Sequence, residues 1–345
     1  MKIIIRGAMI RILILAAFQF SCFAAGLNEI NKVPIRIAYP TATLANGQVG
    51  QVLLKTNILE KNDLEAQITG FQYGAPMMEA LISGKVDVAF TSEVPACLPL
   101  SKGYKATIIA TFGHLGRGAI MVTEDSPIKQ ISDLKGKKIG VPFGSSPHRN
   151  LLGMLRSAGL KPGDDVQVLN IGRDEVALGL IKGGVDAIMI WDPAVEQYRQ
   201  KNYFKIIKAE PFYSVVIMND EFIKKYPQGV IDFIRSLKEA VFFWVSYKDK
   251  VNKWFSEISR LNLEIVKVCS EANSNYRNAK AISDIDIALN SDFLDMMKKS
   301  AEFTANQKVV PVFNILRAVS SQLQEESAKK IDDNAYVISE VIIDE

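Results

Sequence analysis

Apolar positions change their period repeatedly between residue 33 and about residue 210. Short apolar runs, which are typical of strands, alternate with longer stretches in which apolar residues recur at helical spacing. The pattern predicts strands at residues 33–39, 66–73, 85–92 and 137–143, and helices at residues 47–61, 75–84 and 146–160. Asn46 is expected to cap the first of these helices. The alternation is typical of an α/β fold in which helices pack on mostly parallel sheets.

One helix–glycine–strand unit is repeated along the chain. The segment EALISGKVDVAFTSEVP (79–95) aligns with LGLIKGGVDAIMIWDPA (178–194), so that Asp87 corresponds to Asp186. Two copies of one unit predict two similar lobes. The alternative is that helix–glycine–strand is simply a common connection.

Two crossovers are expected to join these lobes. The outgoing crossover is predicted near residues 114–122, where Gly116 and Gly118 can absorb a hinge rotation, and the return crossover at residues 212–219. Long amphipathic helices follow from about residue 220. The predicted limits are a first lobe at 33–116, a second lobe at 117–211, a mostly helical completion of the first lobe at 212–330, and a tail at 331–345 without an assigned role.

The N-terminal segment predicts export. Basic residues precede an apolar stretch that is too short to span a membrane, and small residues follow it. This is the layout of a secretory signal peptide over residues 1–25, so a periplasmic location is predicted. A lipid anchor at Cys22 is the alternative, although the residues before it fit the lipoprotein motif poorly.

Charge and composition exclude several partners. The chain has 41 Lys and Arg against 38 Asp and Glu, and the predicted signal peptide holds three of the basic residues, so the rest is nearly neutral. A neutral chain is a poor partner for nucleic acid. With only two histidines, neither a metal nor a cofactor is predicted. Cys97 and Cys269 are expected to be buried free thiols, and a disulfide between them is left open.

The loop GVPFGSSPHRN (140–150) connects a predicted strand to a predicted helix. The N-terminus of a helix has N–H groups without intrahelical partners and a partial positive charge, so Gly144, Ser145 and Ser146 are candidates for anion binding. The alternative is a turn in which a serine only caps the helix. A hydrolytic serine beside His148 is disfavoured, because the chain has no Gly-x-Ser-x-Gly motif here.

Other candidates come from the ends of the predicted strands, because ligands of open parallel sheets bind beyond the carboxyl ends of the strands. The candidate ligand-binding residues are Thr41, Thr43, Tyr73, Thr91, Ser92, Gly144, Ser145, Ser146, His148, Trp191 and Asp192. Trp191 is either a wall of the site or part of the core, and Asp192 is either a site residue or the cap of the next helix. A Glu93 that faced the site would favour a ligand with an amine.

Two stretches resemble a known family. The run SPIKQISDLKGKKIGVPFGSSPHRN with GGVDAIMIWDP, and the run PMMEALISGKVDVAFTSEVPACLPLSKG, resemble the two lobes of periplasmic solute-binding proteins of the nitrate/sulfonate/taurine class (NMT1/THI5-like). The resemblance implies a two-lobed type II periplasmic-binding-protein fold without catalytic activity. It also implies a monomer that captures a small anionic or zwitterionic solute and delivers it to an inner-membrane ABC permease and its ATPase.

The resemblance also carries residue roles. Gly144, Ser145, Ser146 and His148 match the Gly-Ser-Ser-x-His loop that contacts the anionic group in sulfonate binders, and Trp191 with Asp192 matches their Trp-Asp-Pro element. Pro147 and Arg149 depart from that pattern and indicate a different or larger ligand. The alternatives are a binder of a heteroaromatic pyrimidine-type precursor, an enzyme on this fold, and a sensory domain.

Overall fold

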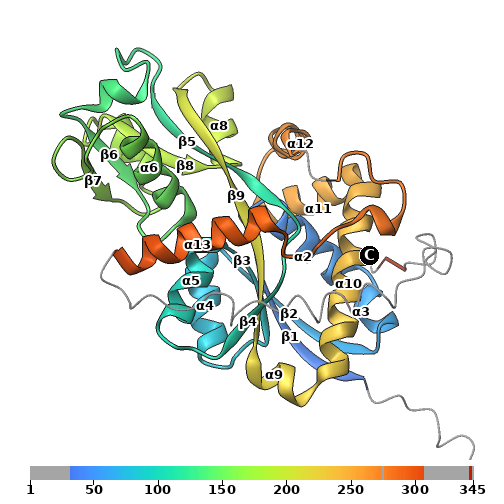
Figure 1. Ribbon diagram of the computed structural model, residues 1–345. Coiled ribbons are helices and arrows are strands. Elements are labelled where there is room, and N and C mark those ends of the chain that lie inside the picture. The colour runs from blue at the N-terminus through green and yellow to red at the C-terminus, as the bar shows by residue number, and fades with distance from the viewer. Residues whose placement is uncertain (1–31, 274–275, 307–341, 344–345) are drawn as a thin grey trace, which may run out of the picture.

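The computed structural model describes residues 32–273, 276–306 and 342–343 (Figure 1). The predicted signal peptide, with Cys22, and most of the 331–345 tail lie outside the described residues. The strands are β1 Val33–Pro40, β2 Leu64–Phe71, β3 Val88–Ser92, β4 Ala106–Ala110, β5 His114–Thr123, β6 Lys138–Val141, β7 Gln167–Asn170, β8 Ala187–Trp191 and β9 Phe204–Asn219. The helices are α2 Asn46–Lys55, α3 Ile58–Lys61, α4 Gly74–Ile82, α5 Glu93–Ser101, α6 Ser146–Ser157, α7 Val176–Ile181, α8 Ala194–Gln200, α9 Asp220–Lys225, α10 Pro227–Ser246, α11 Lys248–Ser259, α12 Leu263–Ala272 and α13 Ser291–Asn306, with 3-10 turns at Ile131–Leu134 and Ile282–Asp284.

The strands form two parallel groups that are joined by antiparallel strands. Their order is β2-β1-β3-β9-β5-β8-β6-β7, and β4 also pairs with β9. Strands β2, β1 and β3 are parallel in the first lobe, and β7, β6 and β8 are parallel in the second. The α/β fold with two lobes that the sequence predicts is confirmed.

Strand β9 belongs to both lobes (Figure 1). Its first part, Phe204–Tyr213, pairs with β5, and its second part, Ser214–Met218, pairs with β3. The predicted crossover segments, 114–122 and 212–219, therefore fall on two strands that are hydrogen-bonded to each other. The residue limits of the lobes stay a prediction, which this pairing supports.

Helices cover both faces of each parallel group. In β3, Val88 and Phe90 belong to one buried cluster and Ala89 to another. In β8, Met189 and Ile190 divide in the same way between two clusters on opposite faces. A strand buried on both faces is apolar throughout, which explains why these strands appear in the sequence as continuous apolar runs.

The two repeated units make the same contacts. Asp87 Oδ2 accepts a hydrogen bond of 2.8 Å from the backbone N–H of Arg36 on β1, and Asp186 Oδ2 accepts one of 2.8 Å from that of Lys138 on β6. In each case the backbone N–H of the aspartate also donates to the carbonyl of the same partner residue, at 2.8 Å. The aligned aspartates thus fix the start of equivalent strand pairs in the two lobes.

The first predicted helix differs from the prediction. It divides into α2 and α3 at Thr56, whose backbone is extended and pairs with Ile343 near the C-terminus. Asn46 is not a cap: its amide group donates to the carbonyl of Thr91 at 2.8 Å, and its Oδ1 accepts from Ser214 Oγ at 2.7 Å. Long-range hydrogen bonds of this kind have no local signal in the sequence.

The C-terminal helices contact both lobes. Helices α10 and α11 pack on α2 in the first lobe, whereas α12 contacts α8 of the second lobe. Helix α13 lies across the junction and packs on both α5 and α6 (Figure 1). The assignment of residues 212–330 to the completion of the first lobe stays a prediction, and α12 and α13 also contact the second lobe. Throughout the ranges that the structure covers, none of the helices has the length and apolar character needed to cross a membrane.

A buried ion pair joins the two lobes next to α13. Glu93, at the start of α5, is fully buried, and its Oε1 accepts from Arg149 Nη2 on α6 at 2.8 Å. Its Oε2 accepts from Ser146 Oγ at 2.9 Å and from the backbone N–H of Tyr213 on β9 at 3.1 Å. Burial raises the pKa of Glu93, and the Arg149 charge opposes that shift. A buried charge needs such compensation, because an unpaired carboxylate out of water is strongly unfavourable.

Removal of the Arg149 charge is expected to destabilise the fold strongly. Arg149→Met leaves the Glu93 carboxylate buried and uncompensated, so the free energy of unfolding in urea is expected to fall by about 3–5 kcal/mol. The double variant Glu93→Gln with Arg149→Met is expected to regain most of this loss, because no charge remains buried. Arg156→Met, on an exposed position of α6, is the matched control. A loss in Arg149→Met no greater than in the control would contradict the interpretation.

Candidate functional site

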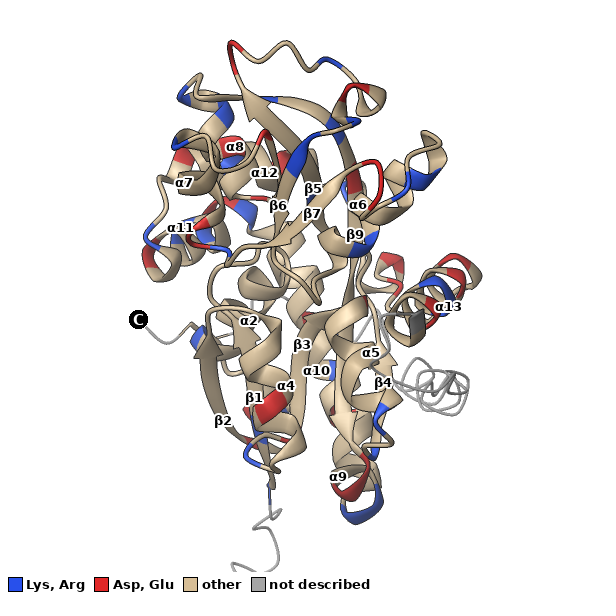
Figure 2. Ribbon diagram, turned by 90° about the vertical axis from the view of Figure 1, so that its left-hand side faces the viewer, with Lys and Arg blue, Asp and Glu red and all other residues tan. Residues whose placement is uncertain are grey.

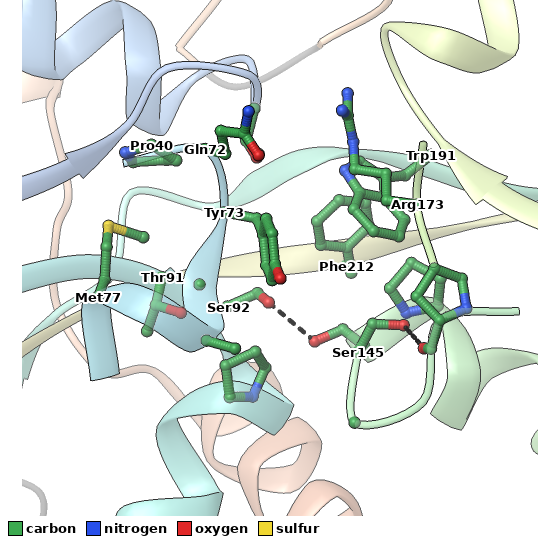
Figure 3. Close-up of a pocket in the computed structure, with 18 of the residues that line it drawn as sticks. Pro40, Gln72, Tyr73, Met77, Thr91, Ser92, Ser145, Arg173, Trp191 and Phe212 are labelled. Atoms are coloured by element: carbon green, nitrogen blue, oxygen red, sulfur yellow. Dashed lines mark hydrogen bonds between the residues drawn. The ribbon is translucent and has the colours of Figure 1, made fainter. Parts of the chain in front are cut away.

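A cavity of about 450 Å³ lies between the two lobes, where strands of both parallel groups end (Figure 3). Its volume is within the ~300–1,000 Å³ typical of small-molecule sites. Eight of the eleven predicted site residues line it: Thr43, Tyr73, Thr91, Ser92, Gly144, Ser145, Ser146 and Trp191. The structure therefore brings together residues from five separate segments of the sequence.

Four helices of at least nine residues begin at this cavity. Asn46 of α2, Gly74 of α4 and Ser146 of α6 are the first residues of their helices and line the cavity, as does Ser92 directly before α5. Each such terminus presents backbone N–H groups without intrahelical partners and a partial positive charge. Together they favour a negatively charged group in the cavity.

Among the polar side-chain groups at the cavity, the Thr91 hydroxyl gives the strongest indication of a ligand. Thr91 is 3% exposed, and within the described part of the chain its Oγ1 has no hydrogen-bond partner. Figure 3 shows this oxygen directed toward the side on which Tyr73 and Ser92 lie. Gly74 allows the close approach of α4, since a Cβ atom there would stand 2.8 Å from Thr91 Oγ1. A buried hydroxyl without a partner is unfavourable, and an anionic acceptor in the cavity would satisfy it.

The serine hydroxyls of the 144–146 loop already have partners in the protein. Ser145 Oγ donates to the carbonyl of Pro142 at 2.7 Å and accepts from the backbone N–H of His148 at 3.2 Å, so it caps α6. Ser146 Oγ donates to Glu93 and accepts from the backbone N–H of Val94 at 3.2 Å. These hydroxyls hold the loop in place and connect it to α5 of the first lobe.

The Asp192 side chain, directly after β8, points away from the cavity between the lobes. Its Oδ2 accepts from Arg117 Nε at 3.0 Å, its Oδ1 is 3.7 Å from Cys269 Sγ, and it lines a second cavity of about 280 Å³. Burial raises its pKa, against the Arg117 charge. Its side chain makes no capping bond to α8, so the capping prediction is wrong. Arg117 is also held by Glu196 at 2.9 Å and does not line the cavity between the lobes.

Thr41 and His148 are also absent from the lining. The Thr41 hydroxyl donates to the carbonyl of Phe71 at 3.1 Å. The His148 ring is stacked on Phe143 with centroids 4.2 Å apart, and it meets Phe303 of α13 edge-on at 5.3 Å. Burial lowers the pKa of His148 to about 4. A ring that is neutral and covered by aromatic side chains supports Phe143 rather than contacting an anion.

Several lining residues are missing from the sequence-based set: Asn46, Gln72, Phe90, Leu115, Phe143, Asn170, Arg173 and Phe212. Arg173 follows β7 by only a few residues, so the rule that ligands bind beyond strand ends would have found it if the strand at residues 167–170 had been included. Phe90 and Phe212 face the cavity from within β3 and β9, and they have no such signal. Cys97 and Cys269 are free and buried, and burial raises the pKa of both thiols. Within the described ranges, no group of three or more His, Cys, Asp or Glu side chains could hold a metal ion.

Acidification is expected to destabilise the protein through His148. Because its pKa in the folded state is about 4 and its ordinary value is 6.5, the unfolded chain takes up this proton first as the pH falls. The contribution of neutral His148 to the free energy of unfolding is fully present above about pH 6.5. It decreases by up to roughly 3 kcal/mol as the pH falls to about 4. The measurement is the free energy of unfolding of wild type and His148→Phe across that range. The wild-type value should fall relative to the variant, and parallel pH curves would contradict the assignment.

Comparisons with known proteins agree on one family. The sequence profile described as NMT1/THI5 like matches residues 59–249. The putative aliphatic sulfonates-binding protein of Escherichia coli K12 is 33% identical over 53% of this chain and 57% of its own length. The taurine-binding periplasmic protein of the same organism is 27% identical over 72% of this chain and 76% of its own length.

Solved structures share the fold. The periplasmic aliphatic sulphonate binding protein SsuA from Escherichia coli has a TM-score of 0.70 at 23% identity and covers 84% of this chain and 98% of its own. A mutant of DszB in complex with biphenyl-2-sulfinic acid has a TM-score of 0.67 at 16% identity and covers 87% of this chain and 100% of its own. DszB is a desulfurization enzyme, so this fold carries both binding proteins and enzymes. Because the profile covers more than half of the chain, the chain belongs to the NMT1/THI5-like family.

Proposed function

We propose that this chain is the exported substrate-binding protein of an ABC importer and that it captures a small organic sulfonate between its two lobes. The observation that carries the proposal is the cavity between the lobes, which is lined by the starts of four helices and by Thr91, whose buried hydroxyl has no partner among the described residues. A sulfonate has one negative charge and three acceptor oxygens, which suits such a set of donors. The names of the relatives, sulfonate-binding and taurine-binding proteins, support the same class of ligand.

The electrostatics of the cavity suit a protein that binds an anion without a chemical reaction. Backbone N–H groups attract an anion through fixed dipoles and form no covalent bond with it. Cys97, Cys269 and His148 are buried outside the lining, whereas the carboxylates of Asp174 and Glu175 and the hydroxyls of Ser92, Ser145 and Ser146 belong to it. The binding proteins among the relatives support a binding role over an enzyme on the same fold.

Closure is proposed to occur about β5 and β9. A ligand that contacts both lobes stabilises the closed arrangement, because its contacts exist only when the lobes meet. The proposed lobe limits are those predicted from the sequence, with the hinge near Gly116 and Gly118. Export would follow from the signal peptide at residues 1–25, and the partners would be an inner-membrane permease and its ATPase, with the protein acting as a monomer.

The distribution of surface charge supports a soluble small-molecule partner. Lys and Arg residues are interspersed with Asp and Glu residues over both lobes of the described part of the chain (Figure 2). Nucleic-acid binding requires a basic face that follows the phosphate backbone. On the side that Figure 2 shows, the described residues form no such basic face.

Loss of the Thr91 hydroxyl is expected to weaken sulfonate binding without unfolding the protein. Thr91→Val keeps the shape of the side chain and removes a hydroxyl that has no partner in the described structure. A hydrogen bond to a charged group contributes about 1.5–3 kcal/mol, so the Kd of methanesulfonate, taurine or benzenesulfonate is expected to rise roughly 10- to 150-fold. Calorimetric titration of the mature protein measures the change.

Thr69→Val, at an exposed position of β2, is the matched control and should bind as the wild type does. Each sulfonate that binds should also raise the melting temperature, because it binds the folded chain alone. Two results would contradict the proposal: no member of the series raises the melting temperature, or Thr91→Val binds as tightly as Thr69→Val.

A further inference from the structure

Aromatic rings form much of the wall of the cavity. The five that line it are Tyr73, Phe90, Phe143, Trp191 and Phe212. Tyr73 and Phe143 are 41% and 46% exposed, whereas Phe90, Trp191 and Phe212 are buried. Exposed aromatic side chains that line a concave site are typical of binding surfaces for apolar groups. Together they make one compartment, which we call the aromatic compartment.

Phe143 is held in place from behind. One face of its ring is stacked on His148 with an interplanar angle of 5°, and His148 in turn packs on Phe303. Phe143 directly precedes the 144–146 loop, His148 lies on α6 and Phe303 lies on α13. A ring that is supported in this way presents an ordered flat surface and loses little conformational entropy when a ligand covers it.

Arg173 completes this compartment. Among the residues described at the cavity it is the one Lys or Arg side chain. Its guanidinium group lies over the Trp191 ring, 5.7 Å from the centroid, and its Nη1 is 3.1 Å from the exposed carboxylate of Asp174. Figure 3 shows Arg173 and Trp191 side by side above Phe212. The guanidinium group therefore lies against the Trp191 ring, and the Arg173 side chain is 23% exposed.

The size of the cavity points away from the smallest anions. At the roughly 30 Å³ that one water occupies in the liquid, about 450 Å³ holds the equivalent of about 15 water-sized groups. On this measure nitrate, with four non-hydrogen atoms, would fill roughly a quarter of the space and taurine, with seven, about half of it, whereas benzenesulfonate has ten. A ligand with a flat apolar body would also remove exposed surface of Tyr73 and Phe143 from water.

We infer that the ligand of this site is an aromatic sulfonate and that Arg173 is the residue that selects it. This inference rests on the proposed function, since the helix N-termini and Thr91 hold the sulfonate group. The ring of the ligand lies in the aromatic compartment, against the walls made by Trp191, Phe212 and Phe143. The Arg173 guanidinium, held over Trp191, meets the negatively polarised face of the ligand ring, an interaction that a saturated tail cannot provide.

A pair of ligands of nearly equal size tests the inference. Benzenesulfonate and cyclohexanesulfonate carry the same acidic group, and only the first has a π face. Calorimetric titration of the mature protein is expected to give a Kd for benzenesulfonate about 10- to 100-fold below that for taurine or methanesulfonate, and about 5-fold or more below that for cyclohexanesulfonate.

Arg173→Met separates the role of Arg173 from general binding. It keeps an unbranched apolar side chain and removes the guanidinium plane, so benzenesulfonate is expected to lose about 5- to 20-fold in affinity. Cyclohexanesulfonate and methanesulfonate should change by less than about twofold. Arg156→Met, at an exposed position of α6, is the matched control and should leave every Kd unchanged.

The possible outcomes distinguish the inference from the function on which it rests. If no sulfonate binds the wild type, the proposed function fails and the inference fails with it. If benzenesulfonate and cyclohexanesulfonate bind equally well, the function stands and the inference is overturned. If Arg173→Met weakens all sulfonates by the same factor, Arg173 contacts the sulfonate group itself, and the selective role is overturned.

Discussion

The carboxylate of Glu93 determines how the two lobes meet. It is removed from water at the start of α5, and its donors, Arg149, Ser146 and the backbone of Tyr213, come from the other lobe and from the strand between the lobes. An isolated charge in this position would be strongly unfavourable, so the contact forms only when all these donors are in place. The same contact fixes the start of α6, and with it one wall of the cavity.

Because Glu93 is satisfied in this way, it places no negative charge in the cavity. Glu93 therefore gives no reason to expect an amine on the ligand, and the carboxylates that do line the cavity are those of Asp174 and Glu175. The anion would meet helix termini and the Thr91 hydroxyl, whose geometry is set by the backbone. The rest of the proposed ligand would meet aromatic side chains. One site would thus separate recognition of the acidic group from recognition of the organic body.

Most of the fold could be predicted from the sequence because both faces of each parallel group are covered, which gives apolar runs that alternate with amphipathic helices. The site was harder to predict than the fold. The rule that ligands bind beyond strand ends gives the position of a residue along its strand, but not the face of the sheet to which its side chain points. Successive residues of a strand point to opposite faces, so Trp191 faces the cavity while Asp192 faces Arg117 and α12. His148 is covered by α13, which lies more than a hundred residues away in the sequence, and no local pattern predicts such a contact.

Strand β9 is continuous through both lobes and is hydrogen-bonded along its length, first to β5 and then to β3. The proposed movement of one lobe relative to the other would therefore twist this paired ribbon, and it would also act on the Glu93–Arg149 contact and on α13, which packs on both α5 and α6. Torsion that keeps the hydrogen bonds is distributed over many residues and has a restoring force, unlike rotation about one or two loop residues. The proposed opening would consequently be limited by the elasticity of this ribbon, and the register of β5 with β9 would be the same before and after a ligand binds.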